Sequence, residues 1–157
     1  MHETRIPLDE TDSRLLDAVQ KDAHLTAQEL GARLNLSASQ AGRRRQRLEE
    51  RGAIRGYVAR LDPLRLGLDV QAFVQVQMAS QTPEAVAAFK HLVEAQPAVI
   101  SVWTLTGEAD YLLRVYCEDL PALNRLVHEV LLPHPSVARV HSQIVMDQLK
   151  PDAPLPT

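Results

Sequence analysis

Arginine and glutamine side chains gather within residues 37–60, where seven arginines stand against two glutamates. Arginine can donate two parallel hydrogen bonds to guanine, and glutamine can pair with adenine, so both side chains suit the major groove of DNA. The residue types therefore predict a DNA-reading element. Its candidate contacts are Ser37, Ser39, Gln40, Arg43, Arg44, Gln46, Arg47 and Arg55.

An arginine-rich helix can instead be a solvated face whose charges pair within the helix, here with Glu49 and Glu50. DNA reading is favoured because the stretch belongs to a predicted helix-turn-helix and because its arginines outnumber its acids. At about 100° per residue, Arg43 and Gln46 fall on one side of the helix and Leu48 falls on the other. We therefore expect one face to pack and the opposite face to read DNA.

A second set of polar groups lies in the loop 104–110. Thr106 and the backbone amide of Gly107 could bind a carboxylate. Glu108 or Asp110 could bind an ammonium group. An amino acid carries both charges, so the loop is a candidate effector site. In the alternative interpretation, Gly107 only permits a tight turn and the acids stay solvated.

Catalysis finds no support among the polar residues. The histidines show no convincing metal-ligand spacing, no glycine-rich phosphate loop is present, and no nucleophile stands beside a plausible base. Cys117, the single cysteine, excludes an internal disulfide and an all-cysteine metal site. We therefore expect no catalytic residue, no metal and no cofactor.

Three short predicted helices position the basic stretch. Asp9 can cap a first helix that ends near residue 22. Thr26 and Glu29 form a capping-box pattern that opens a second helix, which stops around residue 35. Ser37 can cap a third helix, which runs to residue 50 or 51. Because the connection between the last two is so short, the pattern predicts a helix-turn-helix.

The residues after the third helix, 53–62, suggest a short extended element. A winged helix-turn-helix is therefore predicted, with Arg55 and Arg60 available to DNA phosphates. We place the DNA-binding domain at residues 1–62 and a linker at 63–70.

Residues 71–150 predict a second domain, so the chain as a whole belongs to the α+β class. The expected elements are a strand over 70–78, a helix from Pro83 to before Pro97, strands over 99–106 and 110–117, a helix from Asp119, and a strand over 137–146. The order β-α-β-β-α-β is that of the ferredoxin-like split motif. Residues 151–157 are proline-rich and are expected to be a flexible tail.

Both helices of this motif normally cover one face of the sheet, so the other face needs solvent or a partner. Its mixed apolar character favours a partner. A homodimer would place two DNA-reading helices about a two-fold axis, suited to a palindromic site with half-sites about 34–36 Å apart or a multiple of that. The sequence does not fix whether dimers assemble into a tetramer or an octamer.

The net charge of −3 is uneven along the chain. Residues 1–62 hold 11 Lys and Arg against 10 Asp and Glu, whereas residues 63–157 hold 6 against 10. A basic element therefore lies inside an acidic protein, which is compatible with DNA binding. Residues 1–12 contain no apolar run, so we expect no signal peptide, no membrane association and a cytoplasmic location.

Several short motifs occur in a specific order and spacing along nearly the whole chain. They are Leu8-Asp9, Leu15-Leu16, Leu36-Ser37, Arg47-Leu48-Glu49, the run from Gly52 to Tyr57, Leu61-Asp62-Pro63, Leu66-Gly67, the run from Thr106 to Tyr111, and Ile144-Val145-Met146. Together they resemble the Lrp/AsnC family, the feast/famine regulators. The resemblance implies a winged helix-turn-helix, a linking strand and an effector-binding domain that assembles dimers, often octamers, with amino acids as usual effectors. It also adds Ser142 as an effector candidate, at a position where the family commonly has threonine.

Two positions depart from the pattern of this family. Arg45 stands where an apolar residue is usual, and its stem could pack while its head reaches a phosphate. Glu108-Ala109 stands where the family often has aspartate or asparagine followed by an aromatic residue. The second departure changes volume and polarity near the expected pocket, so the effector cannot be copied from the family.

These observations predict a regulator that binds double-stranded DNA sequence-specifically and responds to a small effector, an amino acid by the resemblance. Two alternatives are an effector-independent architectural DNA-binding protein and an amino-acid sensor that acts on another protein. A ligand response separates the first from a regulator. The second would keep its activity when Arg43 and Arg47 are substituted.

Overall fold

The structure, a computed structural model, describes residues 6–157 and divides into two compact units. Unit 1 comprises the chain up to Arg60 together with Lys150–Thr157, and unit 2 comprises Leu61–Leu149. Residues 1–5 of the expected DNA-binding domain lie outside the described residues. Each unit has its own hydrophobic core. The chain therefore passes from one unit to the other twice.

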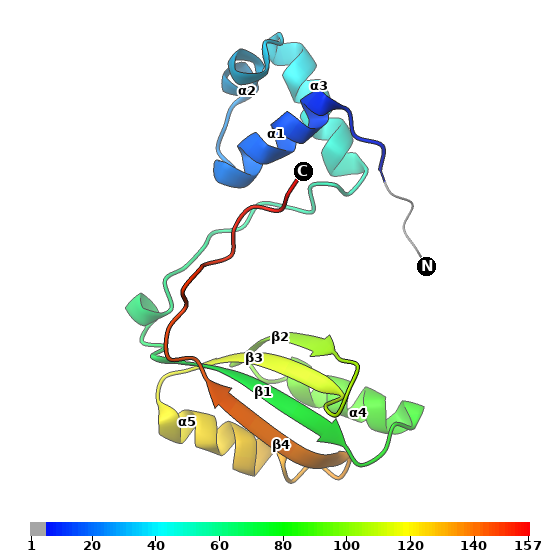
Figure 1. Cartoon of the computed structure of the whole chain (residues 1–157), viewed down its shortest axis with the longest axis vertical. Helices are drawn as coiled ribbons and strands as arrows, with labels where there is room; N and C mark the ends of the chain where they lie inside the picture. Colours follow the sequence, from blue (N-terminus) through cyan, green and yellow to red (C-terminus); the bar gives the residue numbers. More distant parts are fainter. Residues whose placement is uncertain (1–5) are drawn as a thin grey trace. The chain divides into compact units, whose positions relative to one another are not determined.

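Unit 1 is built on three helices, drawn in blue to cyan in Figure 1. They are α1 (Glu10–Lys21), α2 (Ala27–Leu34) and α3 (Ala38–Glu50). Each begins with a capping box, at Asp9, Thr26 and Ser37 respectively. In a capping box, the cap side chain and the side chain three residues on satisfy each other's backbone N–H groups. The three predicted helices are confirmed.

The turn between α2 and α3 is tight. Asn35 adopts the left-handed conformation, with φ 56° and ψ 44°, which asparagine tolerates better than most residues. Gly31 lies so close to the turn that a Cβ atom there would stand 2.7 Å from the carbonyl oxygen of Leu36. Leu30 and Leu48 are completely buried in the core that the three helices share. The turn thus sets how α3 packs on the rest of unit 1.

The expected extended element after α3 pairs with no other segment as a strand within the described chain. Residues 53–62, all of them described, contain no strand. A strand needs a neighbouring backbone with which to share hydrogen bonds. The N–H of Ile54 instead donates to the carbonyl oxygen of Leu48 at 3.2 Å. The helix-turn-helix is confirmed, and the extended wing element stays a prediction.

Unit 2 is a four-stranded antiparallel sheet with its helices on one face (Figure 1). Its elements are β1 (Val70–Met78), α4 (Pro83–Glu94), β2 (Val99–Thr104), β3 (Tyr111–Cys117), α5 (Leu120–Arg125) and β4 (Val137–Ile144). A short 3-10 helix, Leu64–Leu66, precedes β1, and α5 continues as π-helical turns over Leu126–Leu131. The strand order β2-β3-β1-β4 confirms the predicted ferredoxin-like topology.

The two faces of this sheet differ in what covers them. On the helix side, Val74 and Leu113 are completely buried. The opposite face, which we call the open face, carries Phe73, Leu112 and Trp103, and Trp103 is 45% exposed. A partly apolar face without a covering helix favours the partner that the sequence predicts.

The last residues of the chain, expected as a flexible tail, lie against unit 1 in the structure. Residues 150–157 belong to unit 1, where Leu155 is hydrogen-bonded to Gln20 of α1. Pro154 and Pro156 keep this segment out of helices and strand ladders. The composition of this segment is therefore typical of disorder, although side chains of unit 1 can still hold an extended segment by hydrogen bonds.

Candidate DNA-binding surface and effector hollow

α3 presents one exposed polar face and one buried face. Ser39, Arg43 and Gln46 are exposed, whereas Ala41 and Leu48 are completely buried. The Gln46 side chain donates to Glu50 at 2.9 Å. Arg43 makes no hydrogen bond or ion pair with any residue between 6 and 157, so its guanidinium is free to bind an outside ligand.

Arg44 and Arg47, two of the predicted DNA contacts, bind Asp12 of α1. Nη1 of Arg44 lies 2.8 Å from Oδ1 of Asp12, and Nη2 of Arg47 lies 2.6 Å from both carboxylate oxygens. The Asp12 side chain is only 3% exposed. Three charge-assisted hydrogen bonds from two arginines to one buried carboxylate fasten α3 to α1. Their contact with DNA stays a prediction.

Asp9 completes this ion-pair cluster at the start of α1. Its Oδ2 accepts a hydrogen bond from Nη1 of Arg44 at 2.6 Å, and its Oδ1 accepts one from the backbone N–H of Asp12 at 2.7 Å. The Arg44 guanidinium holds the pKa of the Asp9 carboxyl below its usual range, and Asp9 raises the pKa of Arg44 in turn. The pair therefore stays charged at neutral pH.

Arg45, one of the departures from the family pattern, is held inside unit 1. Its Nη1 donates to the carbonyl oxygen of Leu25 at 2.7 Å. Its Nε donates to the hydroxyl of Tyr57 at 2.8 Å and to Glu49 at 3.2 Å. Burial raises the pKa of Tyr57, whose hydroxyl donates to Glu49 at 2.7 Å. Arg45 thus fastens the chain after α3 to the helix, which supports packing over reaching a phosphate.

Ser37 and Gln40 are engaged in the capping box of α3. Oγ of Ser37 accepts from the N–H of Gln40 at 3.2 Å, and Oε1 of Gln40 accepts from the N–H of Ser37 at 3.0 Å. Both residues are exposed, and the amide nitrogen of Gln40 remains as a donor. Arg55 is exposed in the segment after α3. These positions are compatible with the predicted DNA contacts and do not test them.

A hollow of about 320 Å³ lies on the open face of the sheet in unit 2. Its lining comes from β1, β4 and the loop between β2 and β3: Gln75, Gln77, Glu108, Ala109, Arg139, His141 and Gln143. The carboxylate of Glu108 can pair with an ammonium group, and the guanidinium of Arg139 can pair with a carboxylate. The hollow therefore carries the two charges that complement an amino acid.

Glu108 is the predicted effector residue that lines this hollow. Asp110, the other predicted partner for an ammonium group, holds the loop instead. Its Oδ2 accepts from the backbone N–H of Met78 at 2.6 Å, and its Oδ1 accepts from Nε2 of Gln81 at 2.5 Å. Both oxygens of Asp110 are thus already bonded within the chain.

The remaining predicted effector residues lie apart from the lining. Thr106 and Gly107 are exposed in the loop, and Gly107 has a φ of 118°, a conformation that favours glycine. Ser142 pairs with Val74, whose side chain is buried on the helix side. Because side chains opposite each other in a ladder share a face, Ser142 lies on the other face of β4 from the hollow.

The sequence-based prediction missed five polar residues that line the hollow. The signal that could have found them is the alternation of polar and apolar residues along two strands. They are Gln75, Gln77, Arg139, His141 and Gln143, at every second position of two strands. Residues two apart in a strand lie on one face. The predicted ferredoxin-like topology makes β1 and β4 neighbours, and applying it to these alternating positions would have joined the two sets.

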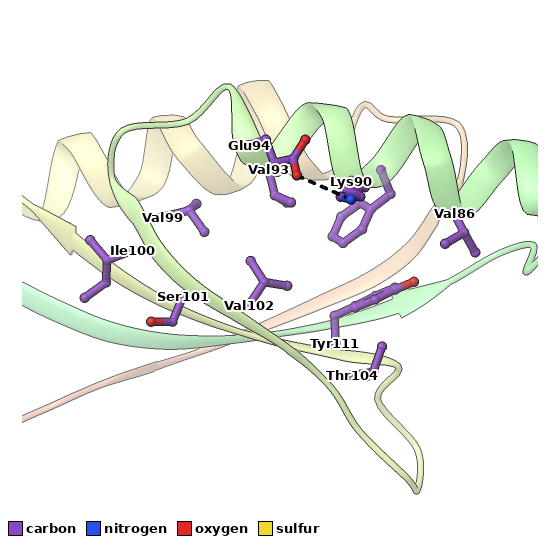
Figure 2. A pocket seen from close by; sticks show the side chains of 11 residues that line it. Val86, Lys90, Val93, Glu94, Val99, Ile100, Ser101, Val102, Thr104 and Tyr111 are labelled. Atoms are coloured by element: carbon purple, nitrogen blue, oxygen red, sulfur yellow. Dashed lines mark ion pairs between the residues drawn. The ribbon is translucent and has the colours of Figure 1, made fainter. Parts of the chain in front are cut away.

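A larger hollow of about 500 Å³ lies between α4 and β2 (Figure 2). Val93, Val102 and the ring of Tyr111 give it largely apolar walls. On α4, Nζ of Lys90 stands 3.7 Å from Oε1 of Glu94. These two charges are each other's partners, so the open-face hollow complements an amino acid better.

Family profiles match both parts of the chain. Residues 8–49 match the AsnC-type helix-turn-helix domain. Residues 71–155 match the Lrp/AsnC ligand binding domain. The chain belongs to the Lrp/AsnC family. As a member of this family it is a DNA-binding transcriptional regulator. Across residues 6–157, none of the helices has the length and apolar character needed to cross a membrane.

Lrp/AsnC relatives align along most of the chain. The DNA-binding transcriptional activator DecR of Escherichia coli strain K12 is 34% identical over 149 residues, which cover 95% of this chain and 98% of DecR. The Bkd operon transcriptional regulator of Pseudomonas aeruginosa is 37% identical over 139 residues, 88% of this chain and 91% of that protein. A transcriptional regulator of Neisseria meningitidis, solved as a complex with L-Met, superposes with a TM-score of 0.91 at 37% identity, covering 96% of this chain and 97% of that one.

Proposed function

We propose that this regulator reads the major groove of double-stranded DNA sequence-specifically with α3. The observation that carries the proposal is the arrangement of the arginines. Arg44 and Arg47 hold α3 on the buried Asp12, whereas Arg43 and Gln46 are exposed on its outer face. A helix held rigidly by some side chains and exposing other donors is suited to base reading. Further proposed contacts are Ser37, Ser39, Gln40 and Arg55.

The proposed effector is an amino acid bound in the open-face hollow. Glu108 would pair with its ammonium group and Arg139 with its carboxylate. A volume of about 320 Å³ lies within the range of small-molecule sites, roughly 300–1,000 Å³. The L-Met complex of the Neisseria meningitidis relative supports an amino acid as the ligand class. Of the predicted residues outside the lining, Thr106 and Gly107 belong to the same loop as Glu108 and remain proposed contacts.

The proposed assembly is a homodimer formed through the open face. Phe73, Leu112 and Trp103 would pack against the same face of a second copy, which would also cover the hollow. A ligand enclosed there would alter the assembly or its geometry and thereby change DNA affinity. Such coupling is typically worth about 1–3 kcal/mol.

Fluorescence anisotropy on DNA from upstream of the regulator's own gene, over a salt series, tests DNA reading. We expect Arg43→Ala and Gln46→Ala each to cost about 1–3 kcal/mol of binding, or roughly 5- to 150-fold in affinity, without lowering thermal stability. Lys90→Ala is the control because it removes an exposed positive charge from unit 2. Unchanged affinity in both α3 variants would contradict the proposal.

The same assay with pooled amino acids tests the effector. We expect the pool to shift DNA affinity, and Glu108→Gln or Arg139→Gln to abolish the shift while DNA binding without ligand persists. Lys90→Gln should respond like the unaltered protein. DNA binding that ignores the pool would favour the architectural alternative. Amino-acid binding without any effect on DNA binding would favour a sensor that acts on another protein.

A further inference from the structure

The side-chain amide of Gln20, in α1, binds both the backbone N–H and the backbone carbonyl oxygen of Leu155. Nε2 of Gln20 donates to the carbonyl oxygen of Leu155 at 3.1 Å, and the backbone N–H of Leu155 donates to Oε1 of Gln20 at 2.7 Å. A primary amide thus pairs with the backbone of one residue as a neighbouring strand would. This reciprocal pair fixes the residue's position along α1.

Two more hydrogen bonds hold the same segment before and after Leu155. The carbonyl oxygen of Asp152 accepts from Nη2 of Arg60 at 3.1 Å. The hydroxyl of Thr157 donates to the carbonyl oxygen of Ser13 at 3.2 Å. These hydrogen bonds, with those of Leu155, hold the segment 152–157 on Ser13, Gln20 and Arg60 of unit 1. Figure 1 draws it in red, ending beside α1.

The composition of the segment suits reversible binding. Pro154 and Pro156 flank Leu155 and favour an extended backbone before binding, which lowers the entropy lost on docking. Leu155 keeps 75% of its surface exposed, so hydrogen bonds rather than apolar burial hold it. Exposed hydrogen bonds each contribute little net free energy, because water can replace them. Docking of this kind can be released without unfolding unit 1.

The segment 152–157 lies next to residues 53–60, which form no strand in the structure. Leu155 lines one hollow together with Leu16 of α1 and the residues 53–58. Arg60, at the end of the same stretch, binds Asp152. The residues that line the two hollows around the segment include none from α3. The docked segment therefore steadies the chain after α3 and leaves the DNA-reading face uncovered.

We propose that residues 152–157 are an intramolecular docking peptide for the groove between α1 and residues 53–60. When docked, the peptide restrains residues 53–60, and when released it leaves them mobile. The inference requires neither DNA nor an effector, so it stands or falls separately from the proposed function.

Limited trypsin digestion of the full-length protein, read by mass spectrometry, tests this inference. Cleavage after Arg55 reports on residues 53–60, and cleavage after Arg44 and Arg47 reports on α3. Because cleavage tracks the population of locally opened chain, Gln20→Leu and a chain ending at Lys150 should both be cut after Arg55 at least about threefold faster than the unaltered protein. Gln28→Leu, an exposed glutamine of α2, should leave the rate unchanged.

A synthetic peptide of residues 151–157, added in excess to the shortened chain, should slow cleavage after Arg55 again. Equal rates in all variants would overturn the proposal. Faster cutting at Arg44 and Arg47 to the same degree would mean general loosening of unit 1, and would also overturn it. Protection of Arg55 that is lost on dilution would show that a second copy supplies the peptide, which would overturn the intramolecular form.

Discussion

At the scale of single residues, Asp12 holds the DNA-binding unit together. It is 2% exposed as a residue and accepts hydrogen bonds from Arg44 and Arg47. The sequence predicts the cap at Asp9 but assigns no role to Asp12, whose part in the capping box the structure shows. Nothing in the spacing of residues 12, 44 and 47 indicates that they meet, because the contact depends on how α1 crosses α3.

We expect Asp12→Asn to destabilise unit 1 by about 2 kcal/mol. The substitution removes the buried negative charge, but both arginines are partly exposed and can regain water, so the cost stays below that of a fully buried pair. Asp17→Asn is the matched control. Its exposed pair with Lys21 should be worth less than about 1 kcal/mol. Urea denaturation measures both, and equal losses would refute the assigned role of Asp12.

The arginines of α3 show where residue-level prediction stops. The helical pattern correctly separates Arg43 and Gln46 from the buried Leu48. It also groups Arg47 with the DNA-reading side chains, and Arg44 is a further candidate contact, although both reach a carboxylate on another helix. A long flexible side chain near the edge of a helix face can turn either way, and only the neighbouring helix decides which.

At the scale of elements, the two glycines within helices of unit 1 differ in what surrounds them. A Cβ atom at Gly31 would approach backbone atoms of the α2–α3 turn, the nearest at 2.7 Å. A Cβ atom at Gly42 would meet only the Cβ of Ala27, at an ordinary 3.7 Å. Gly31 is therefore required for close packing, whereas Gly42 is not.

Opposite effects of alanine are expected at these two positions. Gly31→Ala should destabilise the protein by about 1–2 kcal/mol, because backbone must move to admit the methyl group. Gly42→Ala should stabilise it by about 0.5–1 kcal/mol through the higher helix propensity of alanine. Urea titrations followed by far-UV circular dichroism give both values. A stabilising Gly31→Ala would show that the turn is looser than described.

Elements marked by local chemistry are predictable from this sequence, and elements that need a partner are not. The caps at Asp9, Thr26 and Ser37 place all three helices of unit 1. The extended element predicted at 53–62 has no neighbouring strand within the described chain, so local chemistry alone does not define it. The open-face hollow joins β1 to β4, two strands separated by most of unit 2. A site shared by two such strands depends on the tertiary fold, and neither the hydrophobic periodicity nor the composition of each strand alone indicates it.

At the scale of the whole molecule, Trp103 can report on assembly. It is the single tryptophan of the chain and lies on the open face, 45% exposed. If dimers form through this face, its emission should shift to shorter wavelength as protein concentration rises. Trp103→Lys should weaken the dimer on the order of tenfold or more in size-exclusion chromatography, because buried tryptophans dominate interface energies.

Val58→Lys supplies the comparison for that substitution, since it also adds a charge at an exposed apolar residue, but in unit 1. We expect it to leave the dimer intact. Equal weakening by the two variants would place the interface elsewhere.

Because the chain leaves unit 1 and later returns to it, the two pieces of unit 1 are synthesised at different times. Unit 2 is inserted between the two pieces of unit 1, because residues 150–157 complete a unit that begins with α1. Domains on a ribosome generally fold from the N-terminus onward. Here the three helices can pack early, but Leu155 can bind Gln20 only after β4 and the residues that follow it have been synthesised. The first unit to begin folding is therefore the last to be finished.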